Sequence, residues 1–327
     1  DEEEYRPYFE QKSVLNGMFT FLNRLFGITF KRVEEELWHK KALSYDLHLQ
    51  GKLKARLYLD LEARKSKQGG AWMNNFQTHC RDEKGKEQLA SAVIVCNFPP
   101  SSSRNSSLLR HDDVVTLFHE MGHALHHMLS DVNENGVSGV NGVEWDAVEF
   151  PSQFLENFAY EPSVLKLFAH HYKTKEILPD EMIEKLVKSK NFLSALGMLR
   201  QLEFSLFDFK LHTKLYQGGE VQNLLDSIRE ETALIKPPSY NKFQNGFAHI
   251  FAGGYAAGYY SYKWAEVLSA DAFFGVVEEG IFDSNIAKKY LHIILEGGGA
   301  KSMGILFKEL MGREPNPDSL LRLNGII

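Results

Sequence analysis

The chain of 327 residues is poor in cysteine and has no long apolar run, and each of these shortages excludes some classes of protein. Its two cysteines, Cys80 and Cys96, are too few for a disulfide framework or a cysteine-rich zinc site, so we expect a cytoplasmic setting. No segment reaches the roughly 20 apolar residues of a membrane span, so we expect no membrane partner. A net charge of −6 provides no general attraction to nucleic acid, and we expect no such partner.

The composition and periodicity that are present predict a mainly α fold with a small β-sheet. Apolar and polar residues alternate over 52–61, which is the period of a half-buried strand. A second, more uniformly apolar strand is expected over 91–98. Two strands alone predict a small sheet.

Helical patterns account for most of the remaining chain. Over 14–38 the apolar residues recur at mixed spacings of three and four, which predicts helix and turn with breaks at Gly17 and Gly27. After the Pro- and Ser-rich stretch 99–103, helical patterns continue to the C-terminus without a comparable strand. We therefore expect residues 1–327 to form a single unit.

The segment 119–123 carries the strongest chemical signal. It reads HEMGH, with two histidines one helical turn apart and Glu120 beside the first. Imidazoles at positions i and i+4 converge on one metal ion, and the glutamate is suited to take a proton from a metal-activated water. The segment therefore predicts a catalytic zinc site with His119 and His123 as ligands and Glu120 as general base.

A catalytic zinc ion needs a third protein ligand, and the histidines that follow the motif do not provide it. His127 lies eight residues from His119, about 12 Å along a helix, which is too far for both to bind one ion. We expect His126 and His127 to pack in the interior or to support the ligands. The third ligand should therefore be a carboxylate.

The stretch 144–157 supplies the candidates. Four of its polar residues fall at helical spacing among apolar ones: Asp146, Glu149, Gln153 and Glu156. We expect Glu149 to complete the zinc site. Asp146, one turn earlier, is expected to accept a hydrogen bond from a ligating imidazole and so fix its tautomer.

Together these motifs resemble the thimet oligopeptidase and oligopeptidase A family of zinc peptidases. The likeness runs through almost the whole chain, in four blocks: 118–126 (FHEMGHALH), 148–157 (VEFPSQFLEN), 249–262 (HIFAGGYAAGYYSY) and 312–322 (from GREP to LLR). It implies a zincin-like catalytic domain with one zinc ion on His119, His123 and Glu149. It also implies that Tyr262, with Tyr259 and His249, holds substrate and stabilises the oxyanion.

The resemblance implies a metalloendopeptidase that hydrolyses internal bonds of short, unstructured peptides. One alternative is a dipeptidyl carboxypeptidase of the same family, which would need a donor for the substrate's free C-terminal carboxylate. The other is a zinc-containing peptide-binding module without turnover, against which the intact Glu120 argues. An extended peptide is expected to pair with a sheet edge, either at 68–72 or along 91–98.

Members of this family are considerably longer at the N-terminus, where a helical domain forms the other wall of a deep channel. The present chain starts near the catalytic half, so we expect that domain to be absent from it. The expected partners are therefore short peptides and the chain's own N-terminal domain.

Overall fold

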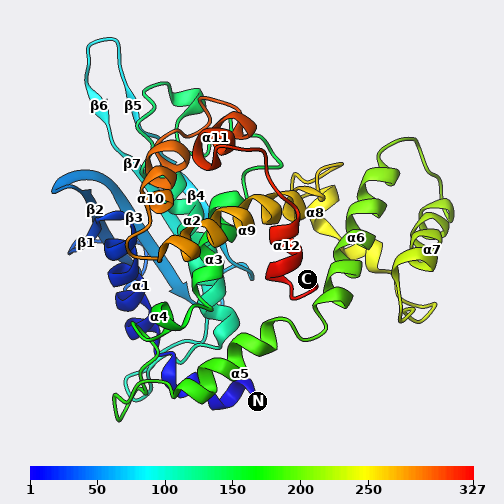
Figure 1. The fold of residues 1–327 in the computed structure, drawn as a ribbon, viewed down its shortest axis with the longest axis horizontal. Helices are drawn as coiled ribbons and strands as arrows, with labels where there is room; N and C mark the ends of the chain where they lie inside the picture. The colour runs from blue at the N-terminus through cyan, green and yellow to red at the C-terminus, as the bar shows by residue number, and fades with distance from the viewer.

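The computed structural model describes residues 1–327 and places helices around one mixed five-stranded sheet (Figure 1). The strands are β1 (Ile28–Val33), β2 (Leu43–Leu49), β3 (Lys52–Glu62), β4 (Trp72–Gln77), β5 (Cys80–Arg81), β6 (Glu87–Gln88) and β7 (Ala90–Phe98). The order in the sheet is β1-β2-β3-β7-β4, and β5 pairs only with β6. Strands β3 and β7 run parallel, whereas the other neighbouring pairs of the large sheet are antiparallel. This order leaves β4 as one edge of the sheet.

Both predicted strands are confirmed as β3 and β7, but the sheet is larger than expected. Strand β1 lies in a stretch for which we predicted helix and turn. Its pairing with β2, from Ile28 opposite Leu49 to Val33 opposite Ser44, supplies hydrogen bonds that its own spacing does not reveal. Tertiary pairing therefore overrides the local pattern here.

The helices surround this sheet, and no named strand follows Phe98, as predicted. The α-helices are α1 (Gln11–Phe26), α2 (His111–Met128), α3 (Phe150–Phe158), α4 (Pro162–Leu165), α5 (Asp180–Lys190), α6 (Ser194–Leu211), α7 (Glu220–Thr232), α8 (Ala248–Phe251), α9 (Ser261–Glu279), α10 (Asn285–Tyr290), α11 (Met303–Met311) and α12 (Asp318–Leu323). Shorter helical turns are η1 (Glu2–Glu4), η2 (Arg6–Tyr8), η3 (Asn135–Val137), η4 (Phe243–Gly246) and the π-helix η5 (Leu291–Leu295). None of these helices is long and apolar enough to cross a membrane.

The two glycines expected to break the first helix play different roles. Gly27 ends α1 in a left-handed conformation, with φ of 72°, as the prediction requires. Gly17 lies inside α1, so the predicted break is wrong at this position. A Cβ atom there would lie 2.4 Å from the Cβ atom of Phe168. Gly17 therefore serves close packing of the helix, not its termination.

The buried apolar side chains form two clusters of very different size. The larger contains 56 buried residues and joins the sheet to α1, α2, α3, α9 and the C-terminal helices. The smaller contains six, from α6 to the start of α9: Phe207, Leu225, Ile228, Phe247, Ile250 and Tyr259. We call residues 194–260 the small unit and the rest of the chain the main body. In Figure 1, α6 and α7 stand out to the right of the main body.

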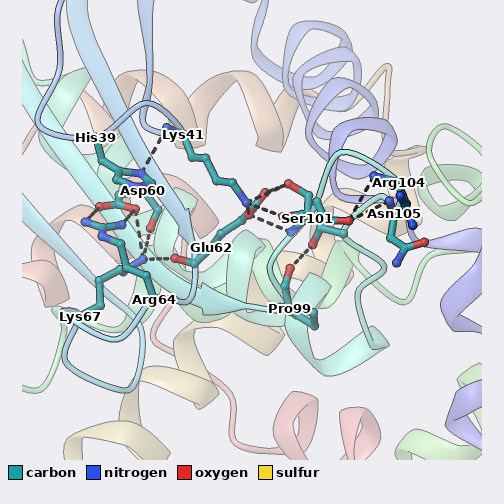
Figure 2. Close-up of polar contacts among 12 residues, drawn as sticks. His39, Lys41, Asp60, Glu62, Arg64, Lys67, Pro99, Ser101, Arg104 and Asn105 are labelled. Carbon is teal, nitrogen blue, oxygen red and sulfur yellow. Dashed lines mark hydrogen bonds and ion pairs between the residues drawn. The ribbon is translucent and has the colours of Figure 1, made fainter.

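A buried polar cluster at the end of β3 fixes the loop that leads into β4 (Figure 2). Asp60 accepts hydrogen bonds from Arg64, Lys67 and Trp38. Lys67 also donates to the backbone carbonyl of Glu62, at 2.9 Å. Burial alone would raise the pKa of Asp60, but the bonds from Arg64, Trp38 and Lys67 lower that pKa to about 2. The cluster thus anchors the segment that ends at edge strand β4.

Candidate metal centre and active site

Helix α2 presents the predicted motif on the side opposite its buried apolar face. Val114, Phe118, Met121 and Leu125 are buried in the main cluster, and α2 packs against β7, β4 and β3. The other side of α2 faces α3. The periodicity of the sequence therefore places the two histidines toward a second helix.

Gly122, in the middle of the motif, lets α3 approach α2 at backbone distance. A Cβ atom at this position would lie 2.4 Å from the carbonyl oxygen of Pro151 and 2.5 Å from Cα of Ser152. Pro151 lies in the first turn of α3, where its missing N–H breaks no helical hydrogen bond. Because the backbones touch here, Glu149 at the start of α3 reaches the motif on α2.

The three predicted ligands come together at this contact. Glu149 Oε2 lies 3.3 Å from His119 Nε2 and 3.1 Å from His123 Nε2. One potential ligand atom from each residue lies within 4.8 Å of the other two. Bonds of about 2.0–2.2 Å in tetrahedral geometry require edges of about 3.3–3.6 Å, so two of these spacings are close to those of a zinc site. The geometry brings the predicted set together, while metal binding itself stays a prediction.

The ligands are electrostatically coupled. Burial alone would lower the pKa of His119, but its hydrogen bonds to Glu149 and Glu156 raise that pKa well above its ordinary value. Burial alone would raise the pKa of Glu149, but hydrogen bonds from His119 and His123 lower it well below its ordinary value. The carboxylate therefore stays ionised, as a metal ligand must.

Glu156, and not Asp146, is hydrogen-bonded to the predicted ligand His119. His119 Nδ1 is hydrogen-bonded to Glu156 Oε1, which leaves Nε2 directed toward Glu149. Asp146 forms no hydrogen bond with either imidazole and instead accepts one from the Tyr260 hydroxyl, at 3.1 Å. The role predicted for Asp146 is wrong because α3 begins only at Phe150, so the helical spacing does not extend back to residue 146.

Glu120 lies beside the ligands and faces a cleft of about 410 Å³. It is 6% exposed, and its carboxylate takes part in no hydrogen bond within the chain. Burial raises its pKa, while the nearby His119 and His123 oppose that rise. A carboxylate with no protein partner, next to three converging ligands, is placed to bind a water or a substrate group.

The glycine-rich segment forms the opposite side of this cleft. His249 and Tyr262 line it, as predicted, and so does Tyr255. Tyr255 donates a hydrogen bond from its hydroxyl to Glu149 Oε1, and its ring stacks on Tyr262 with centroids 4.9 Å apart. Tyr255 is therefore the tyrosine that contacts a predicted metal ligand.

Tyr259 packs beside the cleft and not along it. It is 8% exposed, belongs to the smaller apolar cluster and does not line the cleft. Its hydroxyl donates to Gln201 Oε1, at 3.2 Å. Phe204 and Phe247 surround its ring, at centroid distances of 5.7 and 5.0 Å. The ring also lies 5.8 Å from that of His249 and 5.2 Å from that of Tyr262, so its predicted role in holding substrate stays a prediction.

The two histidines excluded as ligands are buried. Both ring nitrogens of His126 lack a hydrogen-bond partner, and burial, with a smaller effect from His123 and His127, lowers its pKa to about 3. His127 Nε2 lies 2.8 Å from the carbonyl oxygen of Gln77 in β4. The expectation that His126 and His127 pack in the interior is confirmed.

Only one of the two sheet segments proposed for peptide pairing is available. Strand β7 lies between β3 and β4, so both of its edges are occupied and pairing along 91–98 is excluded. Strand β4 has one free edge, and Trp72, Met73 and Asn75 line the cleft together with Ala71. The usable edge therefore begins at the end of the predicted segment 68–72 and continues along β4.

Three residues to which the sequence analysis assigned no role belong to the site: Glu156, Tyr255 and Trp145. Trp145 lines the cleft and packs on Tyr255 with ring centroids 5.0 Å apart. Glu156 had the helical spacing of a supporting residue, and that spacing was the available signal. Nothing in the local sequence distinguishes Tyr255 from the neighbouring tyrosines, because loop geometry decides which ring faces the ligands.

Solved structures share this architecture. PZ peptidase A matches with a TM-score of 0.56 and 20% identity, over 82% of this chain and 42% of that one. An M32 carboxypeptidase from Deinococcus radiodurans R1 matches with a TM-score of 0.52 and 14% identity, over 98% of this chain and 61% of that one. At these identities the likeness shows the fold alone, which is mainly helical with a small sheet.

Curated sequences define the family. The chain is 45% identical to oligopeptidase A of Escherichia coli (strain K12), over 99% of its own length and 48% of that protein. It is 41% identical to a probable cytosolic oligopeptidase A of Arabidopsis thaliana and 34% identical to dipeptidyl carboxypeptidase of Escherichia coli, over the whole chain and 48% of each. The family model "Peptidase family M3" matches residues 1–326. The chain belongs to peptidase family M3, and it spans about half the length of these relatives.

Proposed function

We propose that this chain is the catalytic part of a zinc-dependent oligopeptidase that cleaves internal bonds of short, unstructured peptides. The observation that carries the proposal is the convergence of His119, His123 and Glu149 beside the unpaired Glu120, in a cleft with a free strand edge. Membership of peptidase family M3 and the identity to oligopeptidase A support it.

The donor set suits zinc. Two imidazole nitrogens and one carboxylate oxygen, with Glu156 hydrogen-bonded to the far nitrogen of His119, are typical of catalytic zinc sites that leave one position open. When bound there, zinc would acidify a water molecule and polarise the scissile carbonyl.

The chain's own residues manage the proton and the developing charge. Glu120 takes a proton from the attacking water and delivers it to the leaving amine nitrogen. The Tyr262 hydroxyl donates a hydrogen bond to the carbonyl oxygen as negative charge develops on it. His249, which also lines the cleft, contributes to holding the peptide near this oxygen.

The peptide backbone pairs with the free edge of β4. An extended chain added there would pass the ligands, because residues 71–75 and the motif on α2 line the same cleft. Such main-chain pairing requires an unfolded segment and does not depend on a free terminus. Short, unstructured peptides are therefore the proposed substrates.

The lining of the cleft favours internal cleavage over release of C-terminal dipeptides. No lysine or arginine of this chain is among the residues that line it, so no permanently cationic side chain of this chain is available to pair with a terminal carboxylate. The remaining half of the protein is proposed to form the other wall of the cleft and to set the limit on peptide length. The cytoplasm is the proposed location.

The test is cleavage of an internally quenched peptide by the zinc-loaded chain, with product termini identified by mass spectrometry. We expect internal cuts, and in Glu120→Gln a loss of turnover of roughly a thousandfold with zinc still bound at one equivalent. The exposed Glu134→Gln is the matched control and should keep wild-type turnover.

Other outcomes discriminate among the alternatives. Release of C-terminal dipeptides would identify a carboxypeptidase, and full turnover by Glu120→Gln would exclude the assigned base. If the wild-type chain binds zinc but cleaves nothing, the same assay on the full-length protein decides between a binding module and a need for the other half.

A further inference from the structure

A buried carboxylate in the small unit holds the loop that carries Tyr255. Asp208, on α6, is 1% exposed. Its Oδ1 accepts a hydrogen bond from the backbone N–H of Ala257, at 2.9 Å, and its Oδ2 accepts one from the backbone N–H of Tyr259, at 2.8 Å. Hydrogen bonds to an ionised acceptor are stronger than neutral ones. Asp208 thus fixes two points of the loop at once.

The loop is held in a conformation that it would not adopt by itself. Ala257 has φ of 56°, a left-handed conformation that is unfavourable for a residue with a Cβ atom. Its N–H is one of the two that Asp208 binds. A strained residue held by a buried carboxylate indicates that the surrounding structure determines the path of the loop.

The other face of the loop fits against the ring of Trp145. A Cβ atom at Gly258 would lie 2.9 Å from Trp145 Cδ1, and one at Gly254 would lie 3.3 Å from Trp145 Cζ2. The loop therefore lies between Asp208 of the small unit and Trp145 of the main body.

This path decides where the aromatic groups of the cleft lie. The Tyr255 hydroxyl donates to Glu149, and the Tyr255 N–H donates to the carbonyl oxygen of His249, at 3.0 Å. Tyr255 also stacks on Tyr262. A chain of direct contacts therefore runs from Asp208 through the loop to a metal ligand and to the tyrosine proposed to stabilise the oxyanion.

We infer that Asp208 is a positioning residue for peptide hydrolysis, which holds the 252–260 loop so that Tyr255 and Tyr262 meet the reacting carbonyl. The catalytic part of this inference rests on the proposed function. The hydrogen bonds by which Asp208 holds the loop do not depend on that function, and their effect on the loop is measurable without substrate.

Helix α6 offers a control for a purely structural role. Glu203 is also 1% exposed and pairs with Arg200 and Arg229, at 2.6 and 2.9 Å. It forms no hydrogen bond with the loop. Asp208 also lies 3.0 Å from His212 Nδ1, so both acids contribute to the small unit. Only Asp208 contacts the loop, and this difference is the basis of the test.

The test compares Asp208→Asn with Glu203→Gln by hydrogen exchange and steady-state kinetics on the zinc-loaded chain, and on the full-length protein if turnover requires it. In Asp208→Asn an amide group replaces one acceptor, so we expect amide exchange within 252–260 to accelerate at least tenfold. We expect kcat to fall by a larger factor than KM rises, with zinc still bound at one equivalent. Glu203→Gln should accelerate exchange in α6 and α7 and lower kcat much less.

A second variant separates positioning from general loosening. Ala257→Gly removes the left-handed strain, so in the Asp208→Asn background it should restore part of the lost protection in 252–260 and part of kcat. Unchanged exchange in Asp208→Asn would overturn the inference. An equal loss of kcat in Glu203→Gln would also overturn it. If the wild-type enzyme hydrolyses no peptide, the exchange measurement still decides whether Asp208 holds the loop, while the proposed function fails separately.

Discussion

The main body and the small unit both line the cleft, but they are supported very differently. The main body supplies the three predicted ligands and Glu120 from α2 and α3, which pack into a cluster of 56 buried residues. The small unit supplies His249 and Tyr255 and has a cluster of six. Eight of the nineteen exposed large apolar side chains lie within 194–260.

This difference teaches where rigidity is concentrated. Ligand atoms need fixed spacing, so they lie on helices in the large core. Two of the groups that line the cleft, His249 and Tyr255, lie instead in the weakly packed small unit, where local opening costs less free energy than global unfolding. A peptide has to enter and leave between these two regions, and the wall with the smaller core is the one expected to move.

The largest effect is expected where α2 touches α3. Gly122→Ala places a Cβ atom 2.4 Å from the carbonyl oxygen of Pro151, so the helices must separate. We expect a loss of about 3 kcal/mol or more in the free energy of unfolding and a large loss of zinc affinity. Urea unfolding and zinc titration measure both.

The control is Gly304→Ala in α11, where nothing lies within 4 Å of the added Cβ atom. There the substitution should leave stability unchanged or raise it by about 0.5–1 kcal/mol. If Gly122→Ala behaves like this control, the backbone contact does not set the ligand geometry.

The next prediction compares the two cores directly with Phe154→Ala and Phe207→Ala. Both rings are almost fully buried, Phe154 in the large cluster and Phe207 in the small one. We expect Phe154→Ala to lower the global free energy of unfolding by about 3–5 kcal/mol. Phe207→Ala should accelerate hydrogen exchange mainly within the small unit, residues 194–260, with a much smaller effect on global unfolding. Equal effects of the two substitutions on global unfolding would mean that the regions unfold as one.

A smaller effect is expected at the bond that joins the two regions. Tyr255→Phe removes the hydroxyl that donates to Glu149 and keeps the ring stacked on Tyr262. Loss of a supporting hydrogen bond to a ligand should weaken zinc binding by about 10- to 100-fold, measured by competition with a chelator. Tyr260→Phe is the control, because that hydroxyl bonds to Asp146, outside the ligand set. Unchanged affinity in Tyr255→Phe would show that the small unit does not influence the metal.

The smallest effect concerns acid stability in the main body, away from the small unit. Asp60 has a pKa of about 2 in the folded chain against an ordinary value of 3.8, so its ionised form stabilises the fold at pH values above the pKa of the unfolded chain. That contribution is lost as the pH falls from about 4 toward 2. Asp60→Asn should therefore be less stable than wild type at pH 6, and the difference should shrink in acid.

Urea unfolding of the metal-free chain at several pH values measures this difference. Asp283→Asn is the control, since it removes one negative charge at an exposed position. A difference between wild type and Asp60→Asn that stays constant down to pH 3 would exclude this carboxylate as the titrating group.

The sequence by itself determined what local periodicity can determine. It gave two histidines one turn apart on α2, Glu120 beside them and the alternation of β3, because side chains on one regular element share a face by covalent spacing. It also excluded His127 as a ligand by helical rise alone. The prediction of Glu149 as third ligand followed because a catalytic zinc site needs a third protein ligand and the nearby histidines do not provide it.

The tertiary structure decided which distant elements meet. Glu156, and not Asp146, is hydrogen-bonded to His119 because α3 starts only at Phe150. Tyr255, and not Tyr259, is hydrogen-bonded to Glu149 because of the path of the loop that Asp208 holds. Strand β1 and the free edge of β4 exist only through pairing with other strands. Contacts between segments far apart in sequence depend on packing and hydrogen bonding across the fold. The spacing of residues along a single helix or strand therefore does not predict them.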